Sequence, residues 1–527
     1  MKKIVIIVTV IIAVVVILLL STGLSQDLHD VKERKSNDGE WNKKLGDSNH
    51  DESAMDIIQT DDGGYIIAGV IMSHGVWKGD VWLTKIDKEG NEIWSKTFGG
   101  REDDAGSSVI QADDGYVMAG YAHSYGKGEA DYWLIKTDRS GNEEWNRTYG
   151  GKYDDFGMKV IKTKDRGYAI VGTTHSFNFP DDDIWIIKTD KEGNMLWNKT
   201  FGGNKTEFGD DIIEIEDGYL ISGITYSYTT YGGWDIWLVK ADRQGNEIWS
   251  KTYGWWDFEM NAHIIEVEEG YIIAGTTIST PTGWGDAYLI QIDRQGNEVW
   301  SKTYGGWDSD HVSSIKKTDD GYILAGATET YDVGNLFDAW LLKVDNNGNE
   351  VWNKSFGGRD REVANAVIPT KDGSYIIAGG TGQYPRDANA MVIKCADYSP
   401  PKINIVRPEE NYLYLFDREL MPAKRTLILG SITVIAEVND PMEKVDRVEF
   451  YLCHIGHKYE LQPRAVVYSP PYEWKWNERV ARLYEYEITA GVYYGNAGGV
   501  AADRIEVYIF NLFPISSPSV QAHAKNL

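Results

Sequence analysis

An acidic residue recurs at one position of a repeated pattern and is the first candidate for chemistry. It stands four residues after a Gly-Gly position in most copies, and the first copy supplies Glu52, or Asp51 if the register slips by one. Carboxylates gathered around one opening would suit a hard cation such as calcium. Alternatively, each acid caps its own loop by accepting backbone N–H groups. The members of this predicted acid ring are Glu52, Asp104, Asp155, Glu207, Glu259, Asp310 and Glu362.

Aromatic side chains in variable loops are the second set of candidates. Their types and positions differ between copies, so the repeat does not require them. Exposed aromatic groups among polar neighbours suit the faces of sugars or contacts with proteins. The alternative is that one loop packs on the next. The predicted binding residues are Trp77, Tyr125, Phe177, Tyr231, Trp234, Trp284 and Phe337, with Tyr228 beside them.

Evidence for other chemistry is weak in this sequence. His123 and His175 occupy equivalent positions near Asp104 and Asp155 and could hold a metal, although no ligand spacing supports it. There is no phosphate-binding glycine loop, HExxH, CxxC pair or GxSxG elbow. A catalytic carboxylate pair could still be hidden among the many acids. We therefore name no catalytic residue and no cofactor other than calcium.

The elements that carry these residues are short strands in a repeated unit. Residues 131–151, DYWLIKTDRSGNEEWNRTYGG, alternate large and polar residues on either side of a turn. In that turn Asp138 can bond to its own backbone and Gly141 can adopt a positive φ, as a tight hairpin needs. A second hairpin follows, SSVIQA-DDG-YVMAGYAHS. One unit therefore has four antiparallel strands.

The repeat predicts a seven-bladed β-propeller over residues 39–397. Its tryptophan and tyrosine each recur seven times, the tyrosine at Tyr65, Tyr116, Tyr168, Tyr219, Tyr271, Tyr322 and Tyr375. The last copy stops after the strand Asn389–Ala396, whereas an unmatched fourth strand, Gly39–Gly46, precedes the first copy. We expect the N-terminal strand to complete the last blade and close the ring, which removes exposed sheet edges.

The loops of such a propeller divide between two faces. The short DDG and GNE turns share one face. The loops after the Gly-Gly positions and the variable connections between second and third strands share the other, here called the loop face. A second acid stands before the third strand in six copies, at Asp80, Asp131, Asp183, Asp235, Asp286 and Asp338. Variable loops on a fixed scaffold are where binding is usually found.

The pattern TFGG, acid, DGGYIIAG, DVWLTKID and GNEIW resembles the SBBP-type β-propeller repeats of prokaryotic cell-surface proteins. This resemblance covers residues 39–397 and implies an exported propeller without a known ligand.

After Pro400 and Pro401 the repeat ends and six alternating strands follow. The segments VDRVEFY, PYEWKW and GNAGG with ADRIEVYIFN resemble immunoglobulin-like surface modules. The resemblance implies a β-sandwich over residues 398–512, and we expect residues 513–527 to be disordered.

The start of the chain predicts export. Two lysines precede an apolar run from Ile4 to Leu20. Residues 1–26 are therefore predicted to be a signal peptide cleaved near Ser25 or an uncleaved membrane anchor, followed by a polar linker at residues 27–38.

Only Cys395 and Cys453 could form a disulfide; the alternative is two separate thiols. The net charge of -27 argues against binding nucleic acid.

Two functional hypotheses follow for this extracellular or cell-surface protein. The first is a non-catalytic binding or adhesion protein whose loop face contacts a glycan or a protein, attached to the membrane if the N-terminal segment is uncleaved. The second is a secreted or tethered glycoside hydrolase or lyase that uses carboxylates of the loop face as acid and base. We favour the first because no residue constellation departs from the repeat in an obviously chemical way.

Overall fold

The structure, a computed structural model, describes two parts of the chain. In the repeat region the described residues are 40–46, 50–73, 78–177, 180–229, 232–254, 257–278, 285–306, 308–329, 337–357, 360–382 and 388–397. Between residues 402 and 510 it describes mainly the strands. The predicted signal or anchor (1–26), the linker (27–38) and the tail (513–527) lie outside the described residues. Among those described, no helix is long and apolar enough to cross a membrane.

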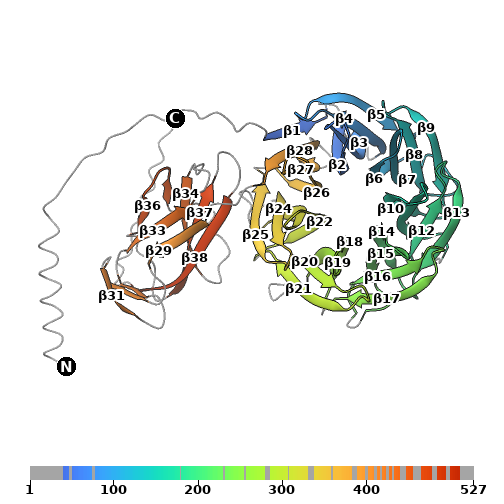
Figure 1. Cartoon of the computed structure of the whole chain (residues 1–527). Helices are drawn as coiled ribbons and strands as arrows, with labels where there is room; N and C mark the ends of the chain where they lie inside the picture. Colours follow the sequence, from blue (N-terminus) through green and yellow to red (C-terminus); the bar gives the residue numbers. More distant parts are fainter. Residues whose placement is uncertain are drawn as a thin grey trace, which may run out of the picture. The chain divides into compact units, whose positions relative to one another are not determined.

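Residues 40–397 form seven four-stranded antiparallel sheets within the described part of the chain, and these follow one another around an opening (Figure 1). The first strand of each sheet is innermost. These first strands are β2 (His50–Gln59), β6 (Asp104–Gln111), β10 (Asp155–Lys162), β14 (Glu207–Glu214), β18 (Glu259–Val267), β22 (Asp310–Lys317) and β26 (Glu362–Pro369). The all-β, propeller-like prediction is confirmed at this level.

The remaining strands follow in sequence toward the outside of the ring. The second strands are β3 (Tyr65–Ser73), β7 (Gly115–Ala122), β11 (Tyr168–Thr174), β15 (Gly218–Thr225), β19 (Gly270–Thr277), β23 (Gly321–Thr328) and β27 (Ser374–Thr381). The third strands are β4 (Gly79–Ile86), β8 (Asp131–Asp138), β12 (Asp183–Thr189), β16 (Asp235–Asp242), β20 (Asp286–Ile292), β24 (Asp338–Asp345) and β28 (Asn389–Ala396). The outer strands are β5 (Glu92–Phe98), β9 (Glu143–Tyr149), β13 (Met195–Phe201), β17 (Glu247–Tyr253), β21 (Glu298–Tyr304), β25 (Glu350–Phe356) and β1 (Trp41–Leu45).

The outer hairpin turn has the predicted chemistry. Asp138 Oδ1 accepts the N–H groups of Ser140 (2.8 Å) and Asn142 (2.9 Å). Gly141 has a φ of 76°, which a residue with a side chain rarely adopts. A Cβ at Gly141 would also lie 2.6 Å from the ring of Trp94 in the neighbouring sheet. Glycine is therefore required both by the turn and by the packing of the next tryptophan.

The N-terminal strand completes the last sheet. β1 pairs antiparallel with β28, with Trp41 opposite Lys394 and Leu45 opposite Ala390. The sheet order is β1-β28-β27-β26, so a segment at the start of the repeat region lies beside its end (Figure 1). The outer edge of β28 is thereby covered, as the unmatched strand at residues 39–46 predicts.

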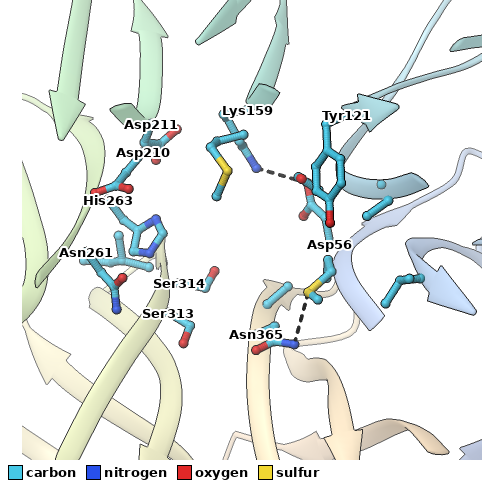
Figure 2. Close-up of a pocket in the computed structure, with 18 of the residues that line it drawn as sticks. Asp56, Tyr121, Lys159, Asp210, Asp211, Asn261, His263, Ser313, Ser314 and Asn365 are labelled. Atoms are coloured by element: carbon cyan, nitrogen blue, oxygen red, sulfur yellow. Dashed lines mark hydrogen bonds and ion pairs between the residues drawn. The ribbon is translucent and has the colours of Figure 1, made fainter. Parts of the chain in front are cut away.

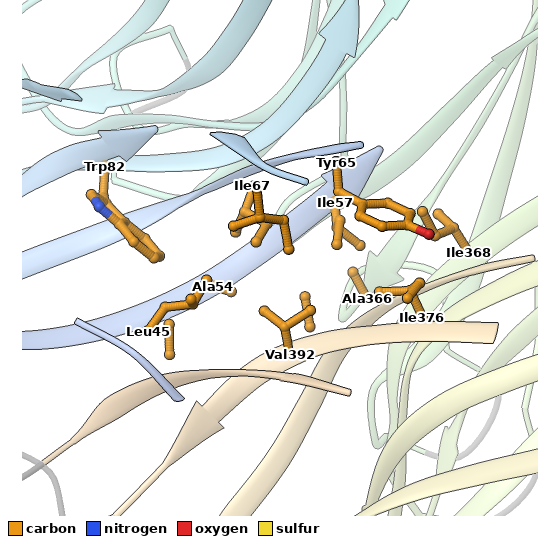
Figure 3. Close-up of a cluster of buried hydrophobic side chains, with 13 residues drawn as sticks. Leu45, Ala54, Ile57, Tyr65, Ile67, Trp82, Ala366, Ile368, Ile376 and Val392 are labelled. Atoms are coloured by element: carbon orange, nitrogen blue, oxygen red, sulfur yellow. The ribbon is translucent and has the colours of Figure 1, made fainter. Parts of the chain in front are cut away.

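Each pair of neighbouring sheets shares a hydrophobic core. The cluster between the first and last sheets contains Leu45 from β1, Ile57 from β2 and Ile376 from β27 (Figure 3). Clusters of the same kind join the other neighbouring sheets in the described region. Burial of apolar surface between sheets therefore holds the first sheet to the last in the same way as every other pair.

The repeat tryptophans and tyrosines belong to these shared cores or pack against them. Trp94 of one sheet packs on Tyr116 of the next, with ring centroids 6.3 Å apart. Trp41 of β1 makes the corresponding contact with Tyr65, at 6.5 Å. Trp94 and Tyr116 belong to the first and second sheets, whereas Trp41 and Tyr65 belong to the last and first sheets. The joint between the last and first sheets therefore has the same aromatic contact as the joint between the first and second.

The C-terminal region consists of two sheets. One contains β29 (Lys402–Arg407), β33 (Ile432–Asn439) and β36 (Tyr472–Trp476). The other contains β31 (Arg418–Pro422), β30 (Tyr412–Leu415), β32 (Leu427–Leu429), β38 (Gly499–Phe510), β37 (Tyr484–Tyr493), β34 (Arg447–His454) and β35 (Ala465–Val467). Phe450 of β34 lies 6.1 Å from Trp474 of β36 between ring centroids, so side chains of the two sheets meet.

The six strands predicted for this region all occur, while β30, β31, β32 and β35 were not expected from the sequence. Gly495 lies outside the described residues. Cys395, in β28, is a free thiol that is 2% exposed. Burial raises the pKa of this thiol to about 12. These observations favour the separate-thiol interpretation for Cys395 over a disulfide with Cys453.

Candidate functional site

A cavity of about 570 Å³ lies among the seven innermost strands and is here called the central cavity. Every first strand contributes to its lining, together with parts of β3 and β7 and Asp103. Figure 2 shows its polar residues projecting inward from separate strands. A volume of this size is within the range of small-molecule binding sites.

A β-bulge in each first strand builds the lining. The pairing with the second strand shifts register at the same place in all seven sheets of the described part, for example between Gly209 and Asp211. A bulge adds an unpaired residue and redirects side chains. The residues that follow the bulge differ from sheet to sheet, being Asp56, Ser108, Lys159, Asp211, His263, Ser314 and Ala366. Within the first strands, the repeat therefore varies where the chain faces the central cavity.

Asp56 connects three sheets inside this cavity. Its Oδ2 accepts hydrogen bonds from Ser108 Oγ (2.9 Å) and Val109 N (3.1 Å) in the second sheet. Lys159 Nζ of the third sheet lies 3.0 Å from the same oxygen (Figure 2). Burial alone would raise the pKa of Asp56, but the positive charges of Lys159 and Lys316 and these hydrogen bonds lower it. The charges of Asp56 and Asp211 likewise outweigh burial and raise the pKa of Lys159.

Asp210 and Asp211 reach the cavity from adjacent positions because the bulge in β14 redirects one of them. Asp210 Oδ2 accepts the N–H of Ala262 (2.9 Å), and Asp211 Oδ2 accepts that of Ile264 (3.2 Å). Burial raises the pKa of Asp210 to about 7, and the charge of Asp211 adds to the increase. Asp210 therefore titrates near neutral pH.

His263 and Lys316 complete the ionisable lining. Burial lowers the pKa of His263 to about 4, so the imidazole is neutral at physiological pH. Burial also lowers the pKa of Lys316, and the nearby charge of Lys159 lowers it further. The cavity thus combines fixed charges, a neutral imidazole and one carboxyl group that titrates near pH 7.

Neutral polar and apolar side chains fill the rest of the wall. Ser107 and Ser313 offer hydroxyl groups, and Asn261 and Asn365 offer amides. Asn365 Nδ2 donates to the carbonyl of Ala54 (2.7 Å). Apolar contact surface comes from Met55, Val70, Met72, Met158 and Ile315, with Tyr121 beside them. A wall of this composition can form hydrogen bonds to a polar ligand while covering its C–H groups.

The predicted acid ring forms part of the loop structure. Asp104 is fully buried and accepts the N–H groups of Gly100 (2.9 Å) and Ser124 (3.0 Å). Glu207 accepts those of Gly203 (2.8 Å) and Ser227 (3.0 Å). This is the loop-capping alternative. The described residues contain no group of three His, Cys, Asp or Glu side chains placed to hold a metal ion.

The second acid of each repeat lies beside the first. A Cβ at Gly150 would come within 1.7 Å of Asp131 Oδ1 and 2.7 Å of Asp155 Oδ2, so both carboxylates crowd around that glycine. Burial raises the pKa of Asp131 to about 6; the Lys127 N–H opposes this increase, and the charge of Asp155 adds to it. Only a residue without a side chain fits between the two acids.

The loop aromatics that the structure describes pack on their own sheets. Tyr125 lies 5.2 Å from Trp133 and Phe177 lies 5.0 Å from Trp185, between ring centroids. Both remain partly open, with exposures of 46% and 54%. The remaining described members also contact other rings: Tyr228 on Trp237, Trp234 on Phe208 and Tyr226, and Phe337 on His311. The predicted residues Trp77, Tyr231 and Trp284 lie outside the described part of the chain.

The two equivalent histidines have separate partners. His123 Nε2 lies 3.7 Å from Asp154, and His175 Nδ1 lies 2.8 Å from Asp182. Each histidine therefore pairs with one carboxylate. The structure does not bring the two together around a shared metal.

Sequence reasoning missed the residues of the central cavity. The signal was present in the aligned copies, because the position two residues before a repeated Ile carries Asp56, Lys159, Asp211 or His263 in different copies. A search for residues that recur in every copy overlooks this position, because its residue varies between copies. Only the structure, with its bulge in each first strand, shows that these residues line the same central cavity.

Comparisons with known proteins add little beyond this geometry. No protein-family model matches the chain. The regulatory protein FlaEY of Caulobacter vibrioides is 23% identical over 299 residues, which is 49% of this chain and 30% of that protein. The chain thus spans about a third of the length of this curated relative.

Solved structures overlap the chain only loosely. The extracellular domain of the one component system BT4673 from B. thetaiotaomicron has a TM-score of 0.29 at 10% identity, covering 88% of this chain and 70% of that one. The periplasmic gluconolactonase PpgL of Pseudomonas aeruginosa has a TM-score of 0.38 at 9% identity, covering 62% and 99%. Sqt1 from Chaetomium thermophilum has a TM-score of 0.39 at 10% identity, covering 64% and 82%. Overlaps of this quality assign no function to the chain.

Proposed function

We propose that residues 39–397 form a closed seven-bladed β-propeller of an extracellular or cell-surface protein, and that this propeller is a non-catalytic binding module. Its ligand is a mono- or disaccharide held in the central cavity. The immunoglobulin-like C-terminal module and the N-terminal segment, as signal or anchor, would display it outside the cell.

The observation that carries this proposal is the composition of the cavity wall. Asp56, Lys159, Asp210 and His263 stand at or beside the bulge, where the seven copies carry five different residue types. The fold of the sheets does not require different residues at this position, whereas the binding of a ligand of low symmetry does. Hydroxyl, amide and charged groups facing Met and Tyr side chains match a sugar, which presents hydroxyl groups along its edges and C–H groups on its faces.

The experiment compares the cavity with the loop face. Purified protein is titrated calorimetrically with the hits from a glycan array. Ser313→Trp and Ser107→Trp, which fill the cavity from two different sheets, are expected to abolish binding while the protein still melts cooperatively. Phe177→Ala, which removes an exposed loop aromatic, is expected to leave affinity within about twofold. Binding that survives both cavity variants and is lost in Phe177→Ala would place the site on the loop face instead.

One observation supports an enzymatic alternative, a polysaccharide-acting hydrolase. A carboxyl group with a pKa near 7 can donate a proton, and Asp211 beside it could act as the ionised partner. Incubation of each bound oligosaccharide with the protein, followed by product analysis, tests this. Turnover that is lost in Asp210→Asn while binding persists would replace the binding function by catalysis.

A further inference from the structure

Lys316 departs from the repeat in a way that the fold does not require. It lies on β22, one residue after Ile315, and lines the central cavity. The other six copies have isoleucine at this position, namely Ile58, Ile110, Ile161, Ile213, Ile265 and Ile368. The scaffold therefore accepts an apolar residue here. Lys316 is partly buried, and a lysine that loses water without gaining a partner costs free energy, so its presence calls for a function.

No ion pair or hydrogen bond of the Lys316 ammonium group occurs within the described part of the chain. Lysines that are more deeply buried in the repeat region are paired: Lys343 lies 2.5 Å from Asp320, and Lys188 lies 2.9 Å from Asp165. The other cavity lysine, Lys159, is paired with Asp56 at 3.0 Å. Lys316 thus differs from the lysines that serve the scaffold.

The acids of the cavity are already engaged. Asp56 accepts three donors at one oxygen and the N–H of Ile57 (3.0 Å) at the other. Asp211 accepts the N–H groups of Ile212 (2.8 Å) and Ile264 (3.2 Å). These carboxylates join neighbouring sheets, whereas Lys316 has its donors available to a ligand. Lys316 is therefore the cation of the lining whose donors remain for a ligand, although the charges of Asp56 and Asp211 act on it from a distance.

We propose that the ligand of the central cavity is an acidic sugar, a hexuronic acid or a disaccharide that contains one, whose carboxylate pairs with Lys316. This inference rests on the proposed function. The hydroxyl and amide groups of Ser313 and Asn365 would bind the sugar hydroxyls. Burial and the charge of Lys159 lower the pKa of Lys316, so an incoming carboxylate would relieve an existing cost.

The test is a calorimetric titration with D-glucuronate and D-galacturonate against their neutral counterparts, D-glucose and D-galactose. The wild type is expected to bind the acidic sugars about tenfold more tightly, as suits one partly buried charge-assisted contact. Lys316→Ile restores the residue of the other copies and should remove that preference without lowering the melting temperature, because it also removes the cost of the unpaired lysine. Lys317→Gln, which removes the same charge from the exposed neighbouring residue, should keep the preference.

The outcomes separate this inference from the function on which it rests. Equal binding of acidic and neutral sugars, or a preference that survives Lys316→Ile, would overturn the acidic-sugar inference and leave a sugar-binding cavity. If neither acidic nor neutral sugars, free or in array oligosaccharides, bind, both proposals fail.

Discussion

At the scale of single residues, position in the cavity decides how an aspartate behaves. Burial raises the pKa of Asp210 to about 7, whereas the charges of two lysines keep the pKa of Asp56 below its usual value despite burial. Both residues stand at the bulge of a first strand. Their opposite shifts follow from their neighbours, since Asp56 has an ion pair and Asp210 has a second carboxylate beside it.

Asp210→Asn should stabilise the protein at alkaline pH. The pKa of Asp210 is higher in the folded state than the value near 3.9 expected when unfolded, so its contribution to stability is complete below that value and is lost as the pH rises through 7. Water in the cavity screens the charge, so we expect a gain of about 1–2 kcal/mol at pH 8 that vanishes near pH 4. Urea unfolding of both proteins across this pH range measures it.

Asp56→Asn is the matched control for that experiment. The lowered pKa of Asp56 predicts the opposite sign, a loss of stability at pH 8 that shrinks as the pH falls through the folded-state pKa. A gain in Asp210→Asn that does not change with pH would contradict the assignment of a raised pKa.

The acid ring makes a different prediction at the same scale. Because Asp104 accepts two backbone N–H groups, Asp104→Asn turns an amide donor toward one of them and should cost about 1–3 kcal/mol. Glu129→Gln, at an exposed acid, should cost nothing measurable. Thermal melts in chelator and in millimolar calcium, at matched ionic strength, should coincide. A calcium-specific increase in Tm that Asp104→Asn abolishes would instead establish a cation site.

At the scale of elements, the bulge in the first strand has the largest consequence. It allows Asp210 and Asp211, neighbours in sequence, both to line the cavity, although successive residues of a regular strand point to opposite faces. The same irregularity at the same place in all seven described first strands produces one cavity. The same bulge in each first strand thus places different residues in the central cavity.

β1 is the element that covers the outer edge of β28. A variant beginning at residue 47 lacks this strand and leaves the edge of β28 unpaired, so we expect a lower Tm and concentration-dependent association through that edge. A variant beginning at residue 39 keeps β1 and should remain monomeric. Light scattering and melting curves of the two variants decide the matter. Identical behaviour would show that pairing between β1 and β28 does not stabilise the protein.

At the scale of the whole repeat region, neighbouring sheets share their cores. Seven clusters of buried side chains among the described residues of this region each draw on two neighbouring sheets, including the cluster between the last and the first (Figure 3). Loss of one sheet would expose apolar surface on two others. The ring should therefore unfold as one cooperative unit rather than sheet by sheet.

Ile376→Ala tests this equivalence. Ile376 lies fully buried between the last and first sheets, and Ile272 occupies the same repeat position between the fifth and sixth. Each alanine variant should lose about 2–5 kcal/mol, as expected for a cavity in a packed core, and each should unfold in a single transition. A much smaller cost for Ile376→Ala than for Ile272→Ala would mean that the ring is weakly joined where its ends meet.

The sequence by itself determined the local structure, because that structure depends on short-range chemistry. Asp138 and Gly141 specify a hairpin turn within a few residues, and the alternating strands beside them follow from the same pattern. The spare strand at Trp41–Leu45 could be matched to the missing partner of β28 by counting alone. Repetition made each inference testable against the other copies.

Only the tertiary structure decided where the candidate site lies. Asp56 and Lys159 are 103 residues apart, and Asp210 and Lys316 stand in different copies, so no local pattern places them together. Their meeting depends on ring geometry and on a bulge whose position follows from side-chain packing between sheets. The sequence pointed instead to the loop acids and aromatics. Among these acids, Asp104 and Glu207 bond to backbone N–H groups of their own loops, because a buried carboxylate needs donors that only the folded backbone supplies.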